Sequence, residues 1–202
     1  MPRTSEQNEI IRLERSKRIE MSALYLFASK GFDGTTLDEI ARESKSSHGL
    51  LYHYFKNKEK LYEYILNKVA IPMILEIVES VNRNQKAKDV LYDTHLAFLK
   101  ALKSENDEYC WAINVLLSVD LSIIAGTKTK YITKANNKNV FMWVFDLVEK
   151  GKEEGDFSRK KDTKQVTAST LSVFKGLAYS RMRLGQKKFI CPTADILMDL
   201  AK

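Results

Sequence analysis

Apolar residues recur at intervals of three and four along most of the chain, which is the spacing of an amphipathic helix. The first such run covers about residues 8–30, and Gly31 ends it. Thr36 and Glu39 then form the sequence pattern of a capping box, which predicts a short second helix over about 37–44. The scarcity of β-branched alternation favours helices over strands throughout.

Two further helices are expected after short turns. Ser47 is placed to cap a third helix that ends near Tyr54, and Asn57 to cap a longer fourth helix that runs to about residue 81. Pro72 should kink or interrupt the fourth helix near Ile71, because proline has no backbone N–H to donate.

The remaining chain also has helical spacing, and with about nine helices the expected fold class is all-α. The long fourth helix should join a small N-terminal domain, residues 1–70, to a larger helical domain, residues 71–202. Further helices are expected over about 90–103, 108–124, 134–152, 163–184 and 193–202. The expected core of the N-terminal domain comprises Ile19, Leu26, Phe27, Phe32, Leu37, Ile40, Ala41, Leu51, Tyr54 and Phe55.

The chain is basic, with a formal net charge of +7 that hints at a polyanionic partner. The charge is not concentrated in the N-terminal domain, however. Residues 1–69 hold 12 Lys and Arg against 10 Asp and Glu, a net charge of +2, which leaves 21 against 16, or +5, for residues 70–202. Any prediction of nucleic-acid binding must therefore rest on a motif.

Several classes of protein are disfavoured by what the sequence lacks. Cys110 and Cys191 do not have the spacing of a metal site, so free thiols in a reducing cytoplasm are favoured over a disulfide or redox switch. The N-terminus is too charged for a signal peptide, and no apolar run could span a membrane. No phosphate-binding glycine loop, nucleophile elbow, metal set or paired acid and base is present. We expect a cytoplasmic protein that is not an enzyme and has no metal, cofactor or membrane partner.

The second and third helices are separated only by the turn at 44–46, which indicates a helix-turn-helix motif over about residues 36–55. In such a motif the second helix enters the major groove of DNA. That placement accounts for the run of polar-tipped aromatic residues after Ser47, and Gly49 would let the backbone approach the DNA closely.

The segment LFASKGFDGTTLDEIARESKSSHGLLYHYFKNKEKL resembles the N-terminal domain of the TetR (tetracycline-repressor-like) family of transcriptional regulators. GFDGTTLDEIA, LYHYF and KNKEKL occur in the family's order and spacing, and the resemblance covers about residues 11–70. It implies a repressor that binds double-stranded operator DNA and is released by a small-molecule effector. An activator, or a regulator controlled by abundance or a protein partner, remains an alternative.

One departure from the family lies in the turn, where Lys45 and Ser46 replace a glycine and an apolar residue. Lysine tolerates a left-handed backbone poorly, so the turn could be strained or reshaped. Among the residues that the resemblance assigns to DNA, His48 and Leu50 are the candidates for reading base edges. The full set is Thr36, Ser46, Ser47, His48, Gly49, Leu50, Tyr52, His53, Tyr54 and Lys58.

In the C-terminal domain, polar and aromatic residues at helical spacing are candidates for a pocket that binds a small hydrophobic or aromatic effector. Residues with this spacing are also typical of an ordinary core, and that alternative stays open for each of them. The candidates are His95, Phe98, Trp111, Asn114, Met142, Phe145, Phe174 and Tyr179.

Small residues recur between Ala168 and Ala178 in the helix expected over about 163–184, and they would allow another helix to approach closely. Together with the helix over about 193–202, this helix could form half of a four-helix bundle across a two-fold axis. Packing within one subunit is the alternative. We expect a homodimer, because a helix-turn-helix protein reads two half-sites through its symmetry.

Overall fold

The computed structural model describes residues 5–124 and 140–202, with only the backbone described for 120–124. Helices make up 76% of this part of the chain, and no strand occurs in it, so the predicted all-α fold is confirmed. The helices are α1 (Ser5–Lys30), α2 (Leu37–Glu43), α3 (His48–Tyr54), α4 (Lys58–Ile65), α5 (Ile71–Glu79), α6 (Ala87–Lys103), α7 (Glu108–Ile124), α8 (Val140–Glu153), α9 (Thr163–Leu184) and α10 (Ala194–Met198), with a π-helical turn η1 (Leu66–Ala70) and a 3₁₀ turn η2 (Gln186–Lys188).

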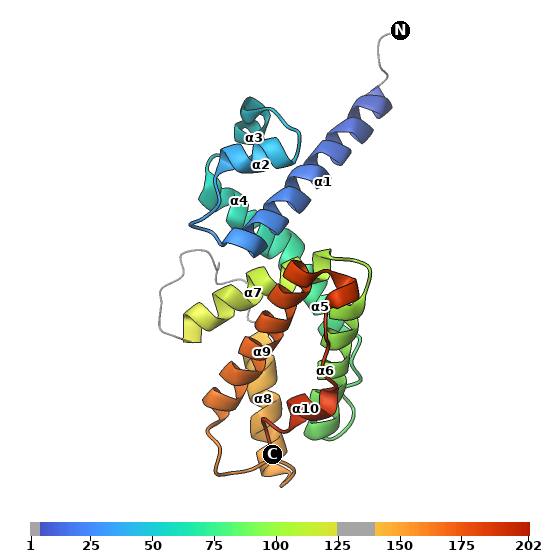
Figure 1. Cartoon of the computed structure of the whole chain (residues 1–202), viewed down its shortest axis with the longest axis vertical. Coiled ribbons are helices and arrows are strands. Elements are labelled where there is room, and N and C mark those ends of the chain that lie inside the picture. The colour runs from blue at the N-terminus through green and yellow to red at the C-terminus, as the bar shows by residue number, and fades with distance from the viewer. Residues whose placement is uncertain (1–4, 125–139) are drawn as a thin grey trace.

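Helices α1 to α4 form a compact group at one end of the molecule, with the first turns of α1 projecting beyond it (Figure 1). Its centre is made by fully buried side chains, among them Ile19, Leu24, Ile40 and Leu51. Seven of the ten residues predicted for this core are buried. The other three, Phe32, Tyr54 and Phe55, are half-buried and pack against it.

The long connecting helix is interrupted near Pro72, as the sequence predicted. The interruption is a π-helical turn that ends just before the proline. The Ile71 N–H donates to the Leu66 carbonyl, five residues back, which is the wider π spacing. The Asn67 side-chain amide donates to the Glu63 carbonyl at 2.7 Å. These hydrogen bonds keep α4, η1 and α5 continuous while changing the helical register between the two ends of the molecule.

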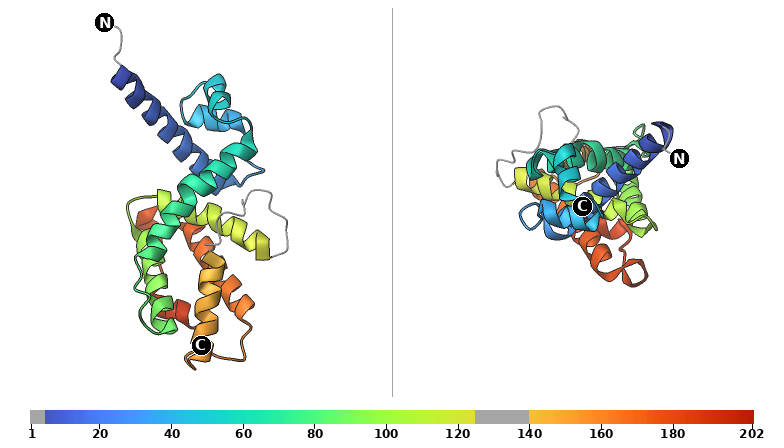
Figure 2. Two further views of the ribbon diagram at one scale, coloured as in Figure 1. Left: turned by 180° about the vertical axis from the view of Figure 1, so that it is seen from behind. Right: turned by 90° about the horizontal axis from the view of Figure 1, so that it is seen from above.

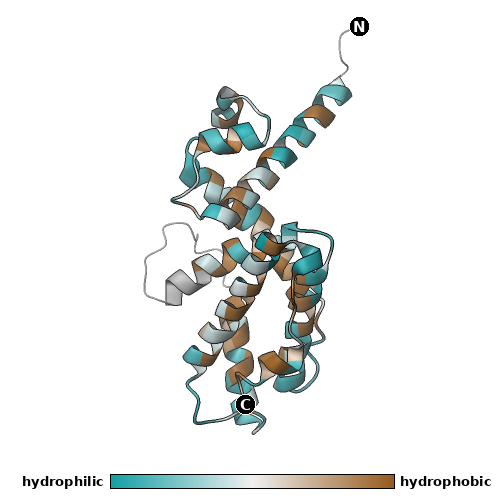
Figure 3. Cartoon of the chain, viewed as in Figure 1, coloured by the Kyte–Doolittle hydropathy of each residue, from teal (hydrophilic) through white to brown (hydrophobic). Residues whose placement is uncertain are grey.

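The larger part of the molecule is a layered bundle in which α7 packs on α9, and α8 packs on both α6 and α9. Apolar residues gather where these helices face one another (Figure 3). The helix predicted over 134–152 begins at Val140 in the described chain, and residues 134–139 lie outside the described residues. The predicted helices at 108–124 and 163–184 have these same bounds in the structure.

The last helix differs from the expectation for 193–202. α10 covers only five residues and packs on α6, with Ala194, Leu197 and Met198 buried. It therefore does not run beside α9, and the predicted pairing of these two helices as half of a four-helix bundle is wrong. The segment between α9 and α10 runs back along the bundle to this position (Figure 1).

The two parts of the molecule meet mainly through α1 against α7, with η1 packed on the same helix. Figure 2 shows from behind how the connecting helix enters the bundle beside this contact. The position of the helix-turn-helix motif is thus tied to the C-terminal bundle both through the chain and by side-chain packing.

Candidate nucleic-acid interface

The start of α2 is fixed by the predicted capping box. The Glu39 N–H donates to the Thr36 hydroxyl at 3.2 Å, and the Thr36 N–H donates to Glu39 Oε2 at 3.1 Å. The ammonium of Lys30 lies 2.7 Å from the other oxygen of Glu39, and this contact lowers the pKa of the Glu39 carboxyl. Local sequence therefore sets where the first helix of the motif begins.

The turn between α2 and α3 places Lys45 in the left-handed backbone conformation that lysine tolerates poorly. Lys45 has φ of +52°, in the left-handed region, and no other non-glycine residue of the described chain has a positive φ. The Ser46 N–H donates to the Ala41 carbonyl at 2.9 Å and the Lys45 N–H to the Arg42 carbonyl at 3.1 Å. These bonds close the helix end in the usual way, so lysine is strained at Lys45 but does not reshape the turn.

We expect Lys45→Gly to raise the free energy of unfolding by about 1 kcal/mol, because removing the Cβ relieves the left-handed strain and the more flexible unfolded chain offsets only part of the gain. Urea unfolding monitored by circular dichroism would measure the change. Lys45→Ala keeps the Cβ and removes the charge, so it should leave stability nearly unchanged. An equal gain in both variants would assign the effect to charge instead of strain.

Helix α3 has one buried side and one open side. Leu51 is fully buried and holds the helix on the core, whereas Ser47, His48, Gly49, Tyr52 and His53 are exposed. Leu50 and Tyr54 are half-buried, so they lie at the edges of the open side. Ser47 caps the helix by accepting a hydrogen bond from the Leu50 N–H at 3.2 Å. The structure thus presents most of the predicted DNA-binding residues on one surface.

Asp38 is a member of this surface that the sequence did not single out. Its carboxylate on α2 pairs with the His48 imidazole, and the His48 ring lies 4.6 Å from the Tyr52 ring between centroids. The contact joins the two helices of the motif and sets the direction of His48. Sequence spacing could not reveal it, because the pair bridges two helices.

Thr36, Tyr52 and Lys58 come from three elements yet line one surface cleft of about 360 Å³, together with Asp38 and Asn57. The Lys58 ammonium donates to the Phe32 carbonyl at 2.9 Å and lies 4.2 Å from the centre of the Phe32 ring. These contacts hold a cation at the base of α4, at the edge of the surface that α3 presents. A phosphate contact from Lys58 fits this placement.

Residues 21–65 match the family model for bacterial regulatory proteins of the tetR family. This part of the chain is a tetR-family domain. One curated relative is the biofilm operon icaADBC negative transcriptional regulator IcaR of Staphylococcus aureus, which is 32% identical over 78 residues, covering 39% of this chain and 42% of IcaR. The chain spans less than half the length of the first curated relatives that it matches.

Similarity of fold extends beyond the tetR-family domain. A mutant of HlyIIR superposes with a TM-score of 0.63 at 21% identity, covering 99% of this chain and 96% of that one. FadR from Bacillus subtilis, solved in complex with stearoyl-CoA, superposes with a TM-score of 0.54 at 15% identity, covering 92% and 96%. At these identities the superpositions establish a shared fold for the N-terminal domain and the C-terminal bundle.

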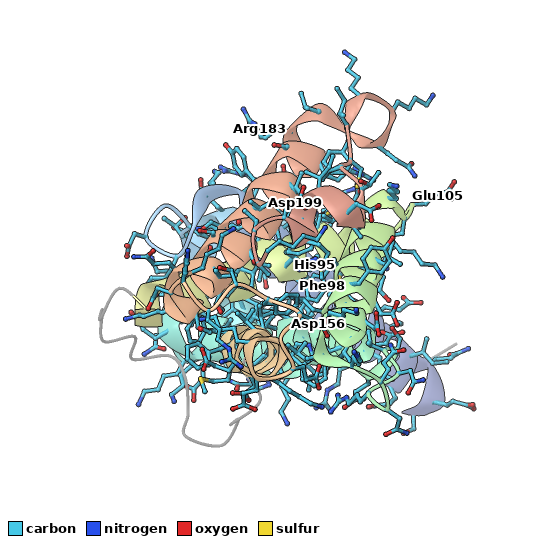
Figure 4. All side chains as sticks on the ribbon, turned by 90° about the horizontal axis from the view of Figure 1, so that it is seen from below. His95, Phe98, Glu105, Asp156, Arg183 and Asp199 are labelled. Atoms are coloured by element: carbon cyan, nitrogen blue, oxygen red, sulfur yellow. The ribbon has the colours of Figure 1, made fainter. Side chains whose placement is uncertain are left out.

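In the C-terminal bundle, three of the eight candidate pocket residues come together. His95 and Phe98 lie on the side of α6 that faces α9 (Figure 4), and the Phe174 ring is 5.5 Å from His95 and 5.2 Å from Phe98 between centroids. All three are buried. Asn114 is also buried, with its amide 3.6 Å from the sulfur of Met182.

The other candidates point elsewhere. Met142 and Tyr179 are exposed at 44% and 46%, and half-buried Phe145 lies beside Phe141. Trp111 lies at the contact between the two parts of the molecule, where its ring meets that of Tyr25. Helical spacing alone could not separate these residues from the inner ones, because it does not say which side of a helix its neighbours cover.

His95 is the most unusual group in the bundle. Only 1% of its surface is exposed, and neither ring nitrogen has a hydrogen-bond partner among the described protein atoms. Burial lowers the pKa of His95 from 6.5 to about 4, so the ring is neutral at pH 7. A neutral imidazole has one donor and one acceptor, and in His95 neither has a partner among the described protein atoms.

The depressed pKa of His95 predicts a specific loss of stability in acid. As pH falls below 6.5, His95 takes up a proton in the unfolded chain before it does so in the folded chain. The free energy of unfolding should therefore decrease by about 3 kcal/mol between pH 6.5 and pH 4. His95→Leu should remove this part of the pH dependence. Urea unfolding at pH 8, 6 and 5 would compare the two proteins. Parallel curves for the variant and the natural chain would contradict the assignment to His95.

Other kinds of site find little support in the described chain. No group of three His, Cys, Asp or Glu side chains that could hold a metal occurs in 5–119 or 140–202. Burial raises the pKa of Cys110 to about 11, which keeps that thiol protonated. None of the helices that the structure describes is both long and apolar enough to cross a membrane.

Proposed function

We propose that the chain is a homodimeric transcriptional repressor that binds operator DNA through α3 and is released by a small molecule bound in the C-terminal bundle. The observation that carries the proposal is the open side of α3. Helix α3 is held in place by the buried Leu51, by the capped start of the helix and by the closed turn before it. Thr36 and Lys58 line a cleft beside its exposed residues. The relative IcaR is named a negative transcriptional regulator, which favours repression over activation.

The effector is proposed to contact His95, Phe98 and Phe174. Two buried aromatic rings would take an apolar body, and the neutral His95 would exchange hydrogen bonds with one polar group on it. An unpaired ligand anion is disfavoured here because a neutral imidazole does not offset its desolvation. FadR, with a similar fold, was solved with a ligand that carries a long acyl chain, which supports an apolar effector for this bundle.

The homodimer is proposed to form through α9, with α8 beside it and without α10. Ser169, Ser172 and Gly176 are exposed at intervals of three and four along α9. A Cβ built on Gly176 would meet no atom within 4 Å. The α9 helix of a second subunit could therefore approach this side closely. Such a dimer would present two α3 helices to the two half-sites of an operator.

We expect Gly176→Arg to convert the dimer to a monomer at micromolar concentration, because the side chain fills the space between the two helices. Within one subunit the change meets open space, and arginine favours a helix over glycine by about 1 kcal/mol, so the monomer should remain folded. Light scattering after size exclusion would measure the mass. Leu96→Arg places the same side chain on the exposed side of α6 and should leave the mass unchanged. A dimeric Gly176→Arg would refute the interface.

Fluorescence anisotropy on labelled DNA from upstream of the protein's own gene would test the proposed function. The assay should run at about 0.15 M salt with excess random duplex, because salt suppresses binding that depends only on phosphate charge. Saturable binding by two subunits per site, reversed by an apolar effector, would support the proposal. If no genomic fragment is retained above random duplex in a genome-wide selection, the proposal fails.

A further inference from the structure

A second surface feature lies where the N-terminal domain meets the bundle, and the residues that line it include none of α3 and neither His95, Phe98 nor Phe174. It is a cleft of about 290 Å³, which is at the small end of the range for ligand pockets. Its walls are Met21, Ser22 and Tyr25 on α1, Glu43 at the end of α2 and Trp111 on α7. Any molecule bound in it would touch both parts of the protein.

Two aromatic rings form one wall of the cleft. The Tyr25 and Trp111 centroids are 5.3 Å apart with the ring planes inclined by 59°. Tyr25 is 38% exposed and Trp111 is half-buried, so part of each ring remains accessible from the cleft. The faces of such rings attract cations through their quadrupoles, and tryptophan does so most strongly.

A carboxylate lines the same cleft as these rings. Glu43 is exposed, and its side chain has no ion pair or hydrogen bond with any residue that the structure describes. Arg18 lies one turn before Met21 and Ser22 on α1, yet no ion pair joins it to Glu43. The negative charge is thus available to a ligand, and the thioether of Met21 adds a polarisable surface beside it.

We propose that this cleft binds a small organic monocation, of the quaternary ammonium or protonated amine class, with its charge between Glu43 and the rings of Tyr25 and Trp111. The rings and the carboxylate attract the same charge, whereas a neutral ligand would meet only the rings and an anion would be repelled. The site is distinct from the effector site proposed above and does not depend on it. Its position against α1 and α7 makes it a second place where a ligand could fix the N-terminal domain on the bundle.

Binding can be measured without DNA. The chain has two tryptophans, so Trp143→Phe leaves Trp111 as the only fluorophore of its kind. Titration with benzyltrimethylammonium should change Trp111 emission saturably, and calorimetry on the natural chain should give the same affinity. Benzyl alcohol and phenylacetate, which are neutral and anionic, should bind at least about fivefold more weakly, as expected for an exposed charge and a cation–π contact.

Three variants separate the proposed contacts from nonspecific binding. Glu43→Gln should lower the affinity for the cation about fivefold at low salt and reduce the salt dependence of binding. Tyr25→Leu should lower this affinity by a similar factor. Arg18→Gln should raise it slightly, because the change removes a positive charge that competes with the ligand. Equal affinity for benzyl alcohol, an unchanged affinity in Glu43→Gln, or no saturation by about 10 mM cation would overturn the proposal. None of these outcomes bears on DNA binding, so failure here leaves the proposed repressor function untouched.

Discussion

Replacing Tyr52 and His53 together with alanine should lower the affinity for the specific duplex by about a hundredfold or more, since each contact to a base or phosphate contributes about 1–3 kcal/mol. Both side chains are exposed on the open side of α3, and Tyr52 also lines the cleft that holds Thr36 and Lys58. Their removal takes away contact surface without opening a hole in the core. The anisotropy assay would measure the loss directly.

The stability of this double variant is its internal control. Tyr52 is 48% exposed, so its truncation should change the melting temperature little. Leu96→Ala removes a side chain of similar exposure, 44%, from α6 and should leave DNA affinity unchanged. Retention of specific binding by the double variant would mean that α3 does not contact DNA through this side, and the proposed function would lose its main support.

Leu51→Ala should lower the free energy of unfolding by about 3 kcal/mol, in the range measured for buried leucines. Leu51 is the one residue of α3 that is fully buried, at 0% exposure, so it anchors the helix on the N-terminal core. Because α3 has only seven residues, it cannot form without that contact. Chemical denaturation would measure the change, and the loss of α3 should also reduce specific DNA binding.

Leu50→Ala provides the matched contrast in the neighbouring position. Leu50 is half-buried at the edge of the open side, so its truncation should reduce stability by less than about 1 kcal/mol while still weakening specific DNA binding. Comparing the two adjacent leucines would then distinguish a residue that anchors α3 on the core from one that contacts DNA. If Leu50→Ala and Leu51→Ala destabilise the chain equally, α3 is rotated relative to the structure described above.

The chain's local sequence determines most of the helix-turn-helix motif. Thr36, Ser47 and Asn57 each cap the helix predicted to follow them, because a side-chain oxygen next to unpaired N–H groups needs no distant partner. The left-handed backbone at Lys45 follows from the same short-range rules, since closing the turn after α2 requires it whatever residue occupies the position. The family resemblance rests on these same residues.

The sequence was less informative about the C-terminal bundle. Its pattern correctly placed α7 and α9, but it could not show that Met142 and Tyr179 point outward while His95, Phe98 and Phe174 meet inside. Helical spacing defines an apolar side, whereas the neighbour that covers this side depends on how the helices cross. Only the folded bundle brings α6 against α9.

By itself, the sequence thus determined the all-α class, the helix bounds around the motif and the tetR-family relationship, because capping, turn closure and apolar periodicity act over a few residues. Tertiary structure alone decided three further features: the packing of α10 on α6, the pairing of His48 with Asp38, and the cleft that Tyr25 and Trp111 help to line. Each depends on contacts between segments that are distant in the chain or lie on different helices. Such contacts are set by the packing of whole helices, which no local pattern records.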